Sequence, residues 1–407
     1  MVLGTCAGPT PATATFSIEF DDEAATLVID AFEQGSLDER AREAILATDG
    51  YQLLIDQVAA ETRPRSERDA VIDALSRAFE SAALGEPNPG FELQRARSSP
   101  AQYRAALLEY RRHAGRLQWR VSDRLRPLLP PSGHVATTVH LIVGGRDAGF
   151  TFSDRDAVVI RLDDFVVRGG GEAIDLDRVA AVLAHELFHV GFRAAGGLPP
   201  RPAETASGWT ELASQYGPDV VGEVWRASAL DDWNPTALES RFSAWVPSRE
   251  WAPLGLDRFV TLMSTVQNEG CAVFVDAPLR DLSGSGRHAR EIEIWMQTIE
   301  ADMRYLADVA DRFARGATPE EMQRALHEGL RDNGPLYRVG YQMAKRIDEH
   351  SGRRPLIDAM TQGPLEFFET YFDTRPYGSD QIDARTQTEI ERIIEEIRAV
   401  GRFDPRG

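Results

Sequence analysis

The feature that most constrains this chain is residues 181–190, AVLAHELFHV, where the pattern HExxH lies inside an apolar run. His185 and His189 are four residues apart, so in a helix both imidazoles project from one face and can bind one metal ion. Glu186 is rotated off that pair, where it can act on a water at the metal without being a ligand. Zinc sites of this kind need one further protein ligand and leave a position open for water. The stretch therefore predicts a zinc-binding helix.

The residues on either side of the pattern also favour a helix. Asp175 or Asp177 can cap its start, the apolar residues of 178–192 have helical spacing, and Gly196 and Gly197 can end it. The alternative to a metal site is a buried helix whose histidines only satisfy hydrogen bonds.

The amino-acid composition limits the kinds of molecule that the protein is expected to bind. The 407 residues carry a net charge of −19, which argues against nucleic acid or an anionic membrane surface as a partner. The hydrophobic content of 43% and charged content of 27% are typical of a soluble globular protein. No apolar run approaches the length of a transmembrane segment. The two cysteines, Cys6 and Cys271, lie far apart in sequence and do not make up a disulfide framework.

The localisation of the protein is left open by its first residues. Residues 1–15 are small and rich in proline and threonine, which predicts a disordered N-terminus. They lack the charged and apolar regions of an intact signal peptide. Residues 3–6, LGTC, are similar to the cleavage box of a bacterial lipoprotein, so Cys6 is a candidate remnant of export. The protein is thus expected either in the cytoplasm or exported with its signal removed.

Periodicity along the chain predicts a mainly α fold of the α+β type. Strands are expected at 16–20, 136–143 and 157–162, and the last of these can pair with an extended substrate while the HExxH helix presents the metal below it. The predicted helices span about 22–34, 49–61, 66–84, 100–127, 256–277, 285–316, 318–331, 335–350, 364–374 and 385–400, and the capping-box pattern at 36–39, SLDE, predicts the start of a further helix.

These elements predict four regions. They are a disordered N-terminus (1–15), a helical N-terminal region (16–130), a catalytic core with a small sheet before the HExxH helix (131–280), and a helical C-terminal subdomain that completes the active-site cleft (281–407). Residues 197–255 read as an insertion in the core, and its tryptophans either line a cleft or pack the insertion onto the body. They are Trp209, Trp225, Trp233, Trp245 and Trp251. His140 lies in a predicted strand and is expected to be structural.

Two glutamates compete to be the third metal ligand. A histidine ligand in the pattern HExxHxxGxxH is excluded, because Phe192 and Ala195 occupy the glycine and histidine positions. Glu269 lies in an apolar helix, where an ionised carboxylate needs a partner such as a metal. Gly270 beside it is expected to allow close approach to the HExxH helix. Glu211 is the rival, and it is closer in sequence to His189.

Hydrolysis of a peptide also needs a hydrogen-bond donor for the oxyanion of the tetrahedral intermediate. Tyr337 and Tyr341 are four residues apart, on one face of a predicted helix, and either hydroxyl can serve. His327 and His350 are weaker candidates for the same role. Gly340 and Ala344 share another face, which predicts close packing of this helix.

The motifs HELFH, NEGCA (268–272) and YRVGYQMAKRI (337–347), in this order, resemble the glutamate-ligand zincins (gluzincins). More closely, they look like bacterial zinc-dependent peptidase families of unknown function, with HExxH, then EGxA, then YxxG. This resemblance implies a zincin-like core, His185, His189 and Glu269 as ligands, Glu186 as catalytic base, and Tyr337 as the tyrosine of the site. The interval between His189 and Glu269 is longer than in the best-known zincins.

The sequence thus predicts a zinc metallopeptidase with one Zn²⁺, a peptide or protein substrate, and Glu186 as general base beside His185, His189 and Glu269, with Tyr337 or Tyr341 as oxyanion donor. Two alternatives stay open. One is a metal-binding or interaction protein with the same fold and no activity, for which an intact Glu186 has no use. The other is a zinc hydrolase of a non-peptide amide. The oligomeric state and the peptide specificity are not predicted.

Overall fold

The computed structural model describes residues 14–194 and 256–401, except 36, 62–67, 86–90, 92, 132, 146, 153–154, 168–172, 282–286, 315–317, 332 and 376–381. The chain forms two compact units. The first comprises Met1–Arg126, Gly133–Gly191 and Asp276–Gly286; the second comprises Pro127–Ser132, Phe192–Val275 and Arg287–Gly407.

A four-stranded sheet forms the centre of the first unit. Its strands are β1 (Thr15–Asp21), β2 (His134–Ile142), β3 (Gly149–Thr151) and β4 (Ala157–Arg161), in the order β1-β2-β4-β3. The first three in that order are parallel, and β3 pairs antiparallel with β4 at the edge. All five residues of β4 are buried, as expected for a strand flanked on both sides. The sequence predicts that the strand at 157–162 pairs with an extended substrate. This strand is β4, and the prediction is wrong because β4 already pairs with β2 and β3; the edge strand is β3.

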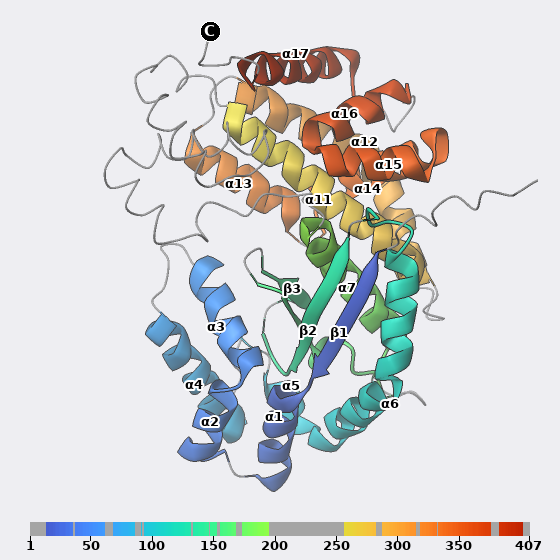
Figure 1. Ribbon diagram of the computed structural model, residues 1–407. Coiled ribbons are helices and arrows are strands. Elements are labelled where there is room, and N and C mark those ends of the chain that lie inside the picture. The colour runs from blue at the N-terminus through green and yellow to red at the C-terminus, as the bar shows by residue number, and fades with distance from the viewer. Residues whose placement is uncertain are drawn as a thin grey trace, which may run out of the picture. The chain divides into compact units, whose positions relative to one another are not determined.

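Helices surround this sheet (Figure 1). They are α1 (Glu23–Gln34), α2 (Glu39–Leu46), α3 (Asp49–Glu61), α4 (Arg68–Leu84), α5 (Leu93–Ser98), α6 (Pro100–Leu125) and α7 (Leu176–Ala194), with a 3-10 turn at Leu162–Asp164. Helices α1 and α3 contact β2, and α6 contacts α1 and β1. Tyr51 of α3 is fully buried and donates a hydrogen bond of 2.5 Å to the carbonyl of Val143, just after β2. This contact fixes α3 against the sheet.

His140 has the structural role that the sequence predicts. It pairs with Asp21 in the parallel register of β2 and β1, and its Nδ1 lies 2.8 Å from an Asp21 carboxylate oxygen. Because the imidazole is buried, the acid satisfies a ring nitrogen that water cannot reach.

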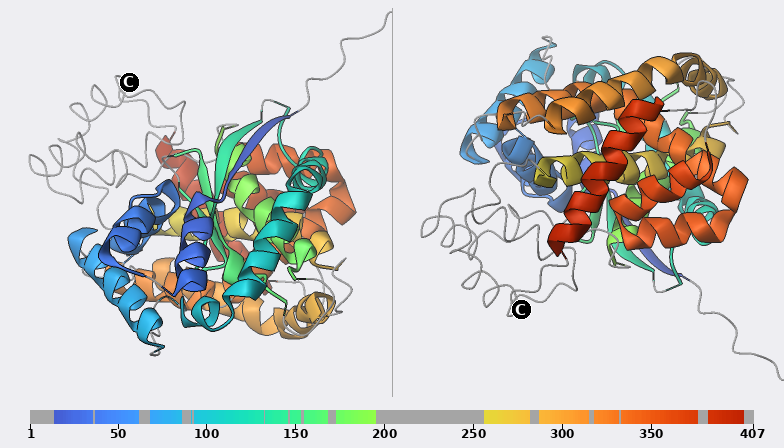
Figure 2. Two further views of the ribbon diagram at one scale, coloured as in Figure 1. Left: turned by 90° about the horizontal axis from the view of Figure 1, so that it is seen from below. Right: turned by 90° about the horizontal axis from the view of Figure 1, so that it is seen from above.

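The second unit consists of helices in the part of the chain that the structure describes. They are α11 (Leu256–Asp281, whose last turns belong to the first unit), α12 (Arg287–Ala314), α13 (Pro319–Leu330), α14 (Pro335–Ser351), α15 (Arg353–Gln362), α16 (Pro364–Asp373) and α17 (Ala384–Gly401). Helix α14 contacts α12, α13, α15 and α16 and is central to the unit. Figure 2 shows α17 across these helices, where it contacts α12 and α16.

Close packing of α14, predicted from Gly340, is confirmed. A Cβ atom at Gly340 would lie 2.0 Å from the carbonyl oxygen of Val266, and one at Gly270 would lie 2.2 Å from Gly340. The backbones of α11 and α14 thus meet at these two glycines. The expectation that Gly270 faces the HExxH helix is wrong, because Gly270 faces α14.

The fold class predicted from the sequence, mainly α with a small sheet before the HExxH helix, is confirmed. The structure adds α5, α15 and β3, which the sequence pattern did not predict. The predicted division into four regions stays a prediction. The expected disorder before residue 14 and the insertion at 197–255, with its tryptophans, lie outside the described residues. None of the described helices combines the length and hydropathy that a membrane crossing requires.

Candidate metal site

Helix α7 begins at an aspartate, as predicted. Asp175 accepts a hydrogen bond of 3.0 Å from the backbone N–H of Arg178, so its side chain satisfies one of the free donors of the first turn. Asp177 instead forms an ion pair with Arg120 of α6. The helix then buries Leu183, Leu187 and most of its other apolar side chains. This packing fixes the rotation of α7 and therefore the direction of its histidines.

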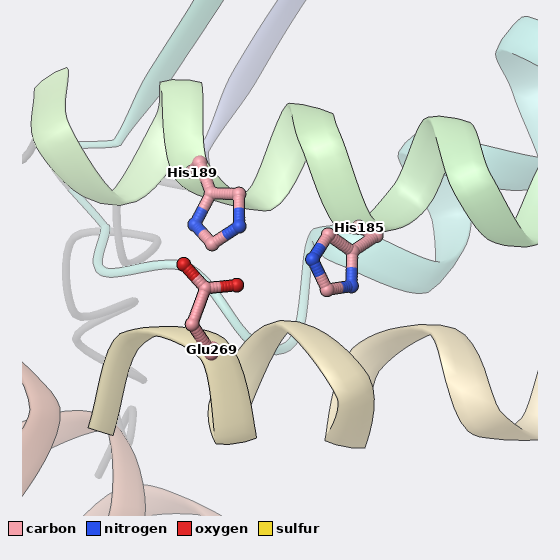
Figure 3. Close-up of side chains that lie close together, drawn as sticks. All are labelled: His185, His189 and Glu269. Atoms are coloured by element: carbon pink, nitrogen blue, oxygen red, sulfur yellow. The ribbon is translucent and has the colours of Figure 1, made fainter. Parts of the chain in front are cut away.

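His185 and His189 lie side by side on α7. Their ring centroids are 4.9 Å apart and the ring planes cross at 79°. Figure 3 shows both imidazoles directed toward helix α11 and the carboxylate of Glu269 directed back toward them. One ligand atom from each of the three residues lies within 4.8 Å of the other two. Among the described residues, this is the one group of three or more histidine, cysteine, aspartate or glutamate side chains so arranged.

Two imidazole nitrogens and a carboxylate oxygen are a donor set that zinc accepts in catalytic sites, at about 2.0–2.2 Å each. Three such atoms within 4.8 Å of one another can bind one ion after small movements. The residues present therefore fit zinc, and a fourth position is left for water or substrate.

Asp276 supports the first histidine of the pair. One of its carboxylate oxygens lies 3.1 Å from Nδ1 of His185, and the aspartate is fully buried. Because a carboxylate only accepts, Nδ1 must donate, which leaves the Nε2 lone pair of His185 for a metal. Zinc-binding histidines commonly donate their second nitrogen to a carboxylate in this way.

Asp276 is a functional candidate that sequence reasoning missed, although a signal was present. It is an acid in the apolar run Val273–Ala277, seven residues after Glu269. Residues seven apart lie on one face of a helix, so a ligand at Glu269 makes an acid at Asp276 a candidate to approach the same histidines.

Glu186 lies beside the histidines on α7 and is 8% exposed. Its side chain faces the edge strand β3: a Cβ built on Gly149 would lie 3.3 Å from Glu186 Cγ. The acid is thus next to the metal group without belonging to it. This is the place that the HExxH pattern predicts for a general base.

The two tyrosines of α14 differ in their surroundings. Tyr341 is 7% exposed and packs against Phe274 of α11, with ring centroids 6.4 Å apart. Tyr337 is half-buried, one turn earlier on the helix. His327 and His350 are exposed at the ends of α13 and α14. The rival ligand Glu211 and Cys6 lie outside the described residues.

Part of the chain matches a protein family. Residues 248–373 match the family model described as "Putative zinc dependent peptidase (DUF5700)". The matched segment contains Glu269, Tyr337 and Tyr341, and it begins after the HExxH helix. No curated protein and no solved structure matches the chain. The family description supports a zinc-dependent peptidase; it does not test the roles of individual residues.

Proposed function

We propose that the protein is a zinc-dependent peptidase that holds one zinc ion with His185, His189 and Glu269. The observation that carries this proposal is the approach of their three ligand atoms to within 4.8 Å. Further support comes from the family matched by residues 248–373. The longer interval between His189 and Glu269 is no obstacle, because α7 and α11 present the three side chains toward one another (Figure 3).

Bound zinc supplies a Lewis acid that lowers the pKa of a water ligand and polarises a carbonyl. Glu186 is proposed as the general base: its carboxylate accepts a proton from the attacking water and later donates it to the leaving amine. Glu186 is adjacent to His185 in sequence, and its burial on α7 shields the side chain from bulk water. Asp276 orients His185 by accepting the proton of Nδ1.

Tyr337 or Tyr341 is proposed to donate its hydroxyl proton in a hydrogen bond to the developing oxyanion. We place this role first on Tyr337, because Tyr341 is buried against Phe274. A donor aimed at the charge that develops in the transition state lowers the barrier without tightening substrate binding in the ground state.

The substrate is proposed to be a peptide in extended conformation. Strand β3 pairs with β4 on one side only, so its outer edge faces no other strand in the described part of the chain. An extended peptide can add to such an edge through backbone hydrogen bonds. Because β3 lies against Val182 and Glu186, a peptide bound there is held beside the proposed base.

The test is Glu186→Gln in zinc-loaded protein, assayed on a broad library of fluorescence-quenched peptides. The amide keeps the size of the side chain but cannot accept the proton, so zinc content is expected to be unchanged and kcat to fall on the order of 10²–10⁴-fold. Wild-type turnover in the variant would remove Glu186 as the base. A zinc-loaded wild-type protein that cleaves no peptide in the library would favour the inactive binding protein or the amide hydrolase.

A further inference from the structure

Strand β3 lies close to α7 at Gly149. A Cβ atom there would lie 2.7 Å from Cγ1 of Val182 and 3.3 Å from Cγ of Glu186. Val182 and Glu186 are one helical turn apart, so both lie on the face of α7 that meets the strand. The backbone of β3 therefore rests on the helical turn that carries Glu186.

Glycine is needed at position 149 for space and not for backbone conformation. The glycines with positive φ in the described chain include Gly144 and Gly145 but not Gly149, which has ordinary strand geometry. Any other residue would suit the backbone but would collide with Val182. Valine in a helix is almost confined to one χ1 rotamer, so its methyl group cannot rotate out of the way.

The contact is confined to one face of α7. The three atoms nearest to a Cβ at Gly149 belong to Val182, Glu186 and Ile160, and none belongs to a histidine. His185 lies about 100° around the helix from its neighbour Glu186, and His189 lies about two helical turns beyond Val182. A Cβ at 149 thus meets the side chain of the acid, and neither proposed histidine ligand is among its three nearest neighbours.

We propose that Gly149 is a positioning residue that sets the place of the Glu186 side chain beneath β3. This inference rests on the proposed function, in which Glu186 is the general base. Because Gly149 has no Cβ, the backbone of β3 can pack directly against the Glu186 side chain and restrict its movement. Any larger residue at 149 displaces the acid by a few tenths of an ångström, the movement that a 3.3 Å contact requires.

The first test is Gly149→Ala. Zinc stoichiometry is expected to stay at the wild-type value, and kcat to fall on the order of tenfold to hundredfold, because small misplacements of a catalytic group are costly. KM is expected to change less than kcat. A crystal structure of the metal-free variant should show Glu186 displaced away from β3. A Glu186 that keeps its wild-type position would overturn the proposal.

A second variant separates positioning from packing. In Gly149→Ala/Val182→Ala the collision with Cγ1 of Val182 is removed, but the 3.3 Å contact with Glu186 remains. The melting temperature should therefore recover, while Glu186 stays displaced and kcat stays low. If kcat returns to the wild-type value together with the melting temperature, Gly149 serves packing alone and the proposal fails.

Gly50→Ala is the matched control. A Cβ at Gly50 of α3 would lie 2.8 Å from Cγ2 of Ile142, a collision of the same size with another branched side chain, away from α7. It should lower the melting temperature and leave kcat and zinc binding unchanged. A fall in kcat there as large as in Gly149→Ala would count against the proposal. The crystallographic readout needs no activity, so a failure of the proposed function is distinguished from a failure of this inference.

Discussion

Nδ1 of His185 and a carboxylate oxygen of Asp276 lie 3.1 Å apart, although the two residues are 91 positions apart in sequence. The pair joins α7 to the last turns of α11. It also decides the tautomer of His185, because only a protonated Nδ1 can donate to a carboxylate. We therefore propose that this fully buried aspartate acts on the candidate metal site through the imidazole and not as a ligand.

Asp276→Asn should weaken zinc binding. The amide keeps the shape of the side chain but loses the charge that orients the imidazole and raises its basicity, so affinity should fall about 10–100-fold in competition with a chelator. Asp21→Asn is the control, since it alters a histidine–aspartate pair of 2.8 Å at His140, outside the metal group. Equal affinities of the Asp276→Asn variant and the wild type would contradict the role given to Asp276.

Glu269→Ala should lose zinc. Two imidazoles alone leave the ion without its third protein ligand, so elemental analysis after dialysis should find well under one zinc per chain. Glu211→Ala should retain the metal at the wild-type ratio. The reverse result would show that Glu211 is the third ligand and that Glu269 does not bind the metal.

Tyr337→Phe should lower kcat on the order of 10²–10³-fold, the usual cost of removing one oxyanion donor, and leave zinc content unchanged. Tyr341→Phe should have a much smaller effect, because the packing of its ring against Phe274 is kept. The measurement is steady-state kinetics of both variants on one peptide. A larger loss of kcat in Tyr341→Phe than in Tyr337→Phe would show that Tyr341 is the oxyanion donor.

Gly340→Ala should destabilise the protein strongly. The new Cβ would lie 2.0 Å from the carbonyl oxygen of Val266 and 2.7 Å from Cα of Gly270, and these backbone atoms cannot rotate away. The helices α11 and α14 must separate, at a cost of about 3 kcal/mol or more in the free energy of unfolding. Gly115→Ala on α6 is the control, because nothing lies within 4 Å of its Cβ. That variant should gain about 0.5–1 kcal/mol in urea unfolding; equal losses in both would contradict the packing account.

Cys271 should be unreactive in the folded protein. The residue is buried beside Glu269 on α11, and burial raises the pKa of its thiol, so the nucleophilic thiolate is scarce at pH 8. In a Cys6→Ser background, a disulfide reagent should label Cys271 only when urea unfolds the chain. Labelling at the rate of a free thiol in native buffer would show that α11 opens readily.

The helices were predictable because their signals are local. The spacing of apolar residues in 178–192 predicts α7, and the capping box at Thr318 predicts α13, where Thr318 and Glu321 exchange hydrogen bonds of 2.8 and 3.2 Å. Helix α15 was missed because Gly352 and Pro355 near its start suggest a turn. Strand β3, with three residues, is too short to show an alternating pattern.

The residues of the candidate site were predictable where local sequence patterns identify them, but not where contacts between distant elements determine their surroundings. Glu269 follows from a carboxylate in an apolar helix, and its role as ligand stays a prediction. The prediction that Gly270 faces the HExxH helix was wrong for a geometrical reason. Adjacent helical residues point about 100° apart, so Gly270 and Glu269 cannot both face α7. The edge position of β3, and with it the contact between Gly149 and Glu186, depends on strand order, which no local pattern contains.

Glu269 and Asp276 lie two turns apart on the single helix α11. A deletion or insertion of one residue between them would turn one relative to the other by about 100°, so the proposed ligand Glu269 and the partner of His185 could not both keep their places. Length changes among related chains should therefore be absent from this interval and from His185–His189. The sequence between the two helices is under no such restriction, so length differences among related chains are expected to fall there.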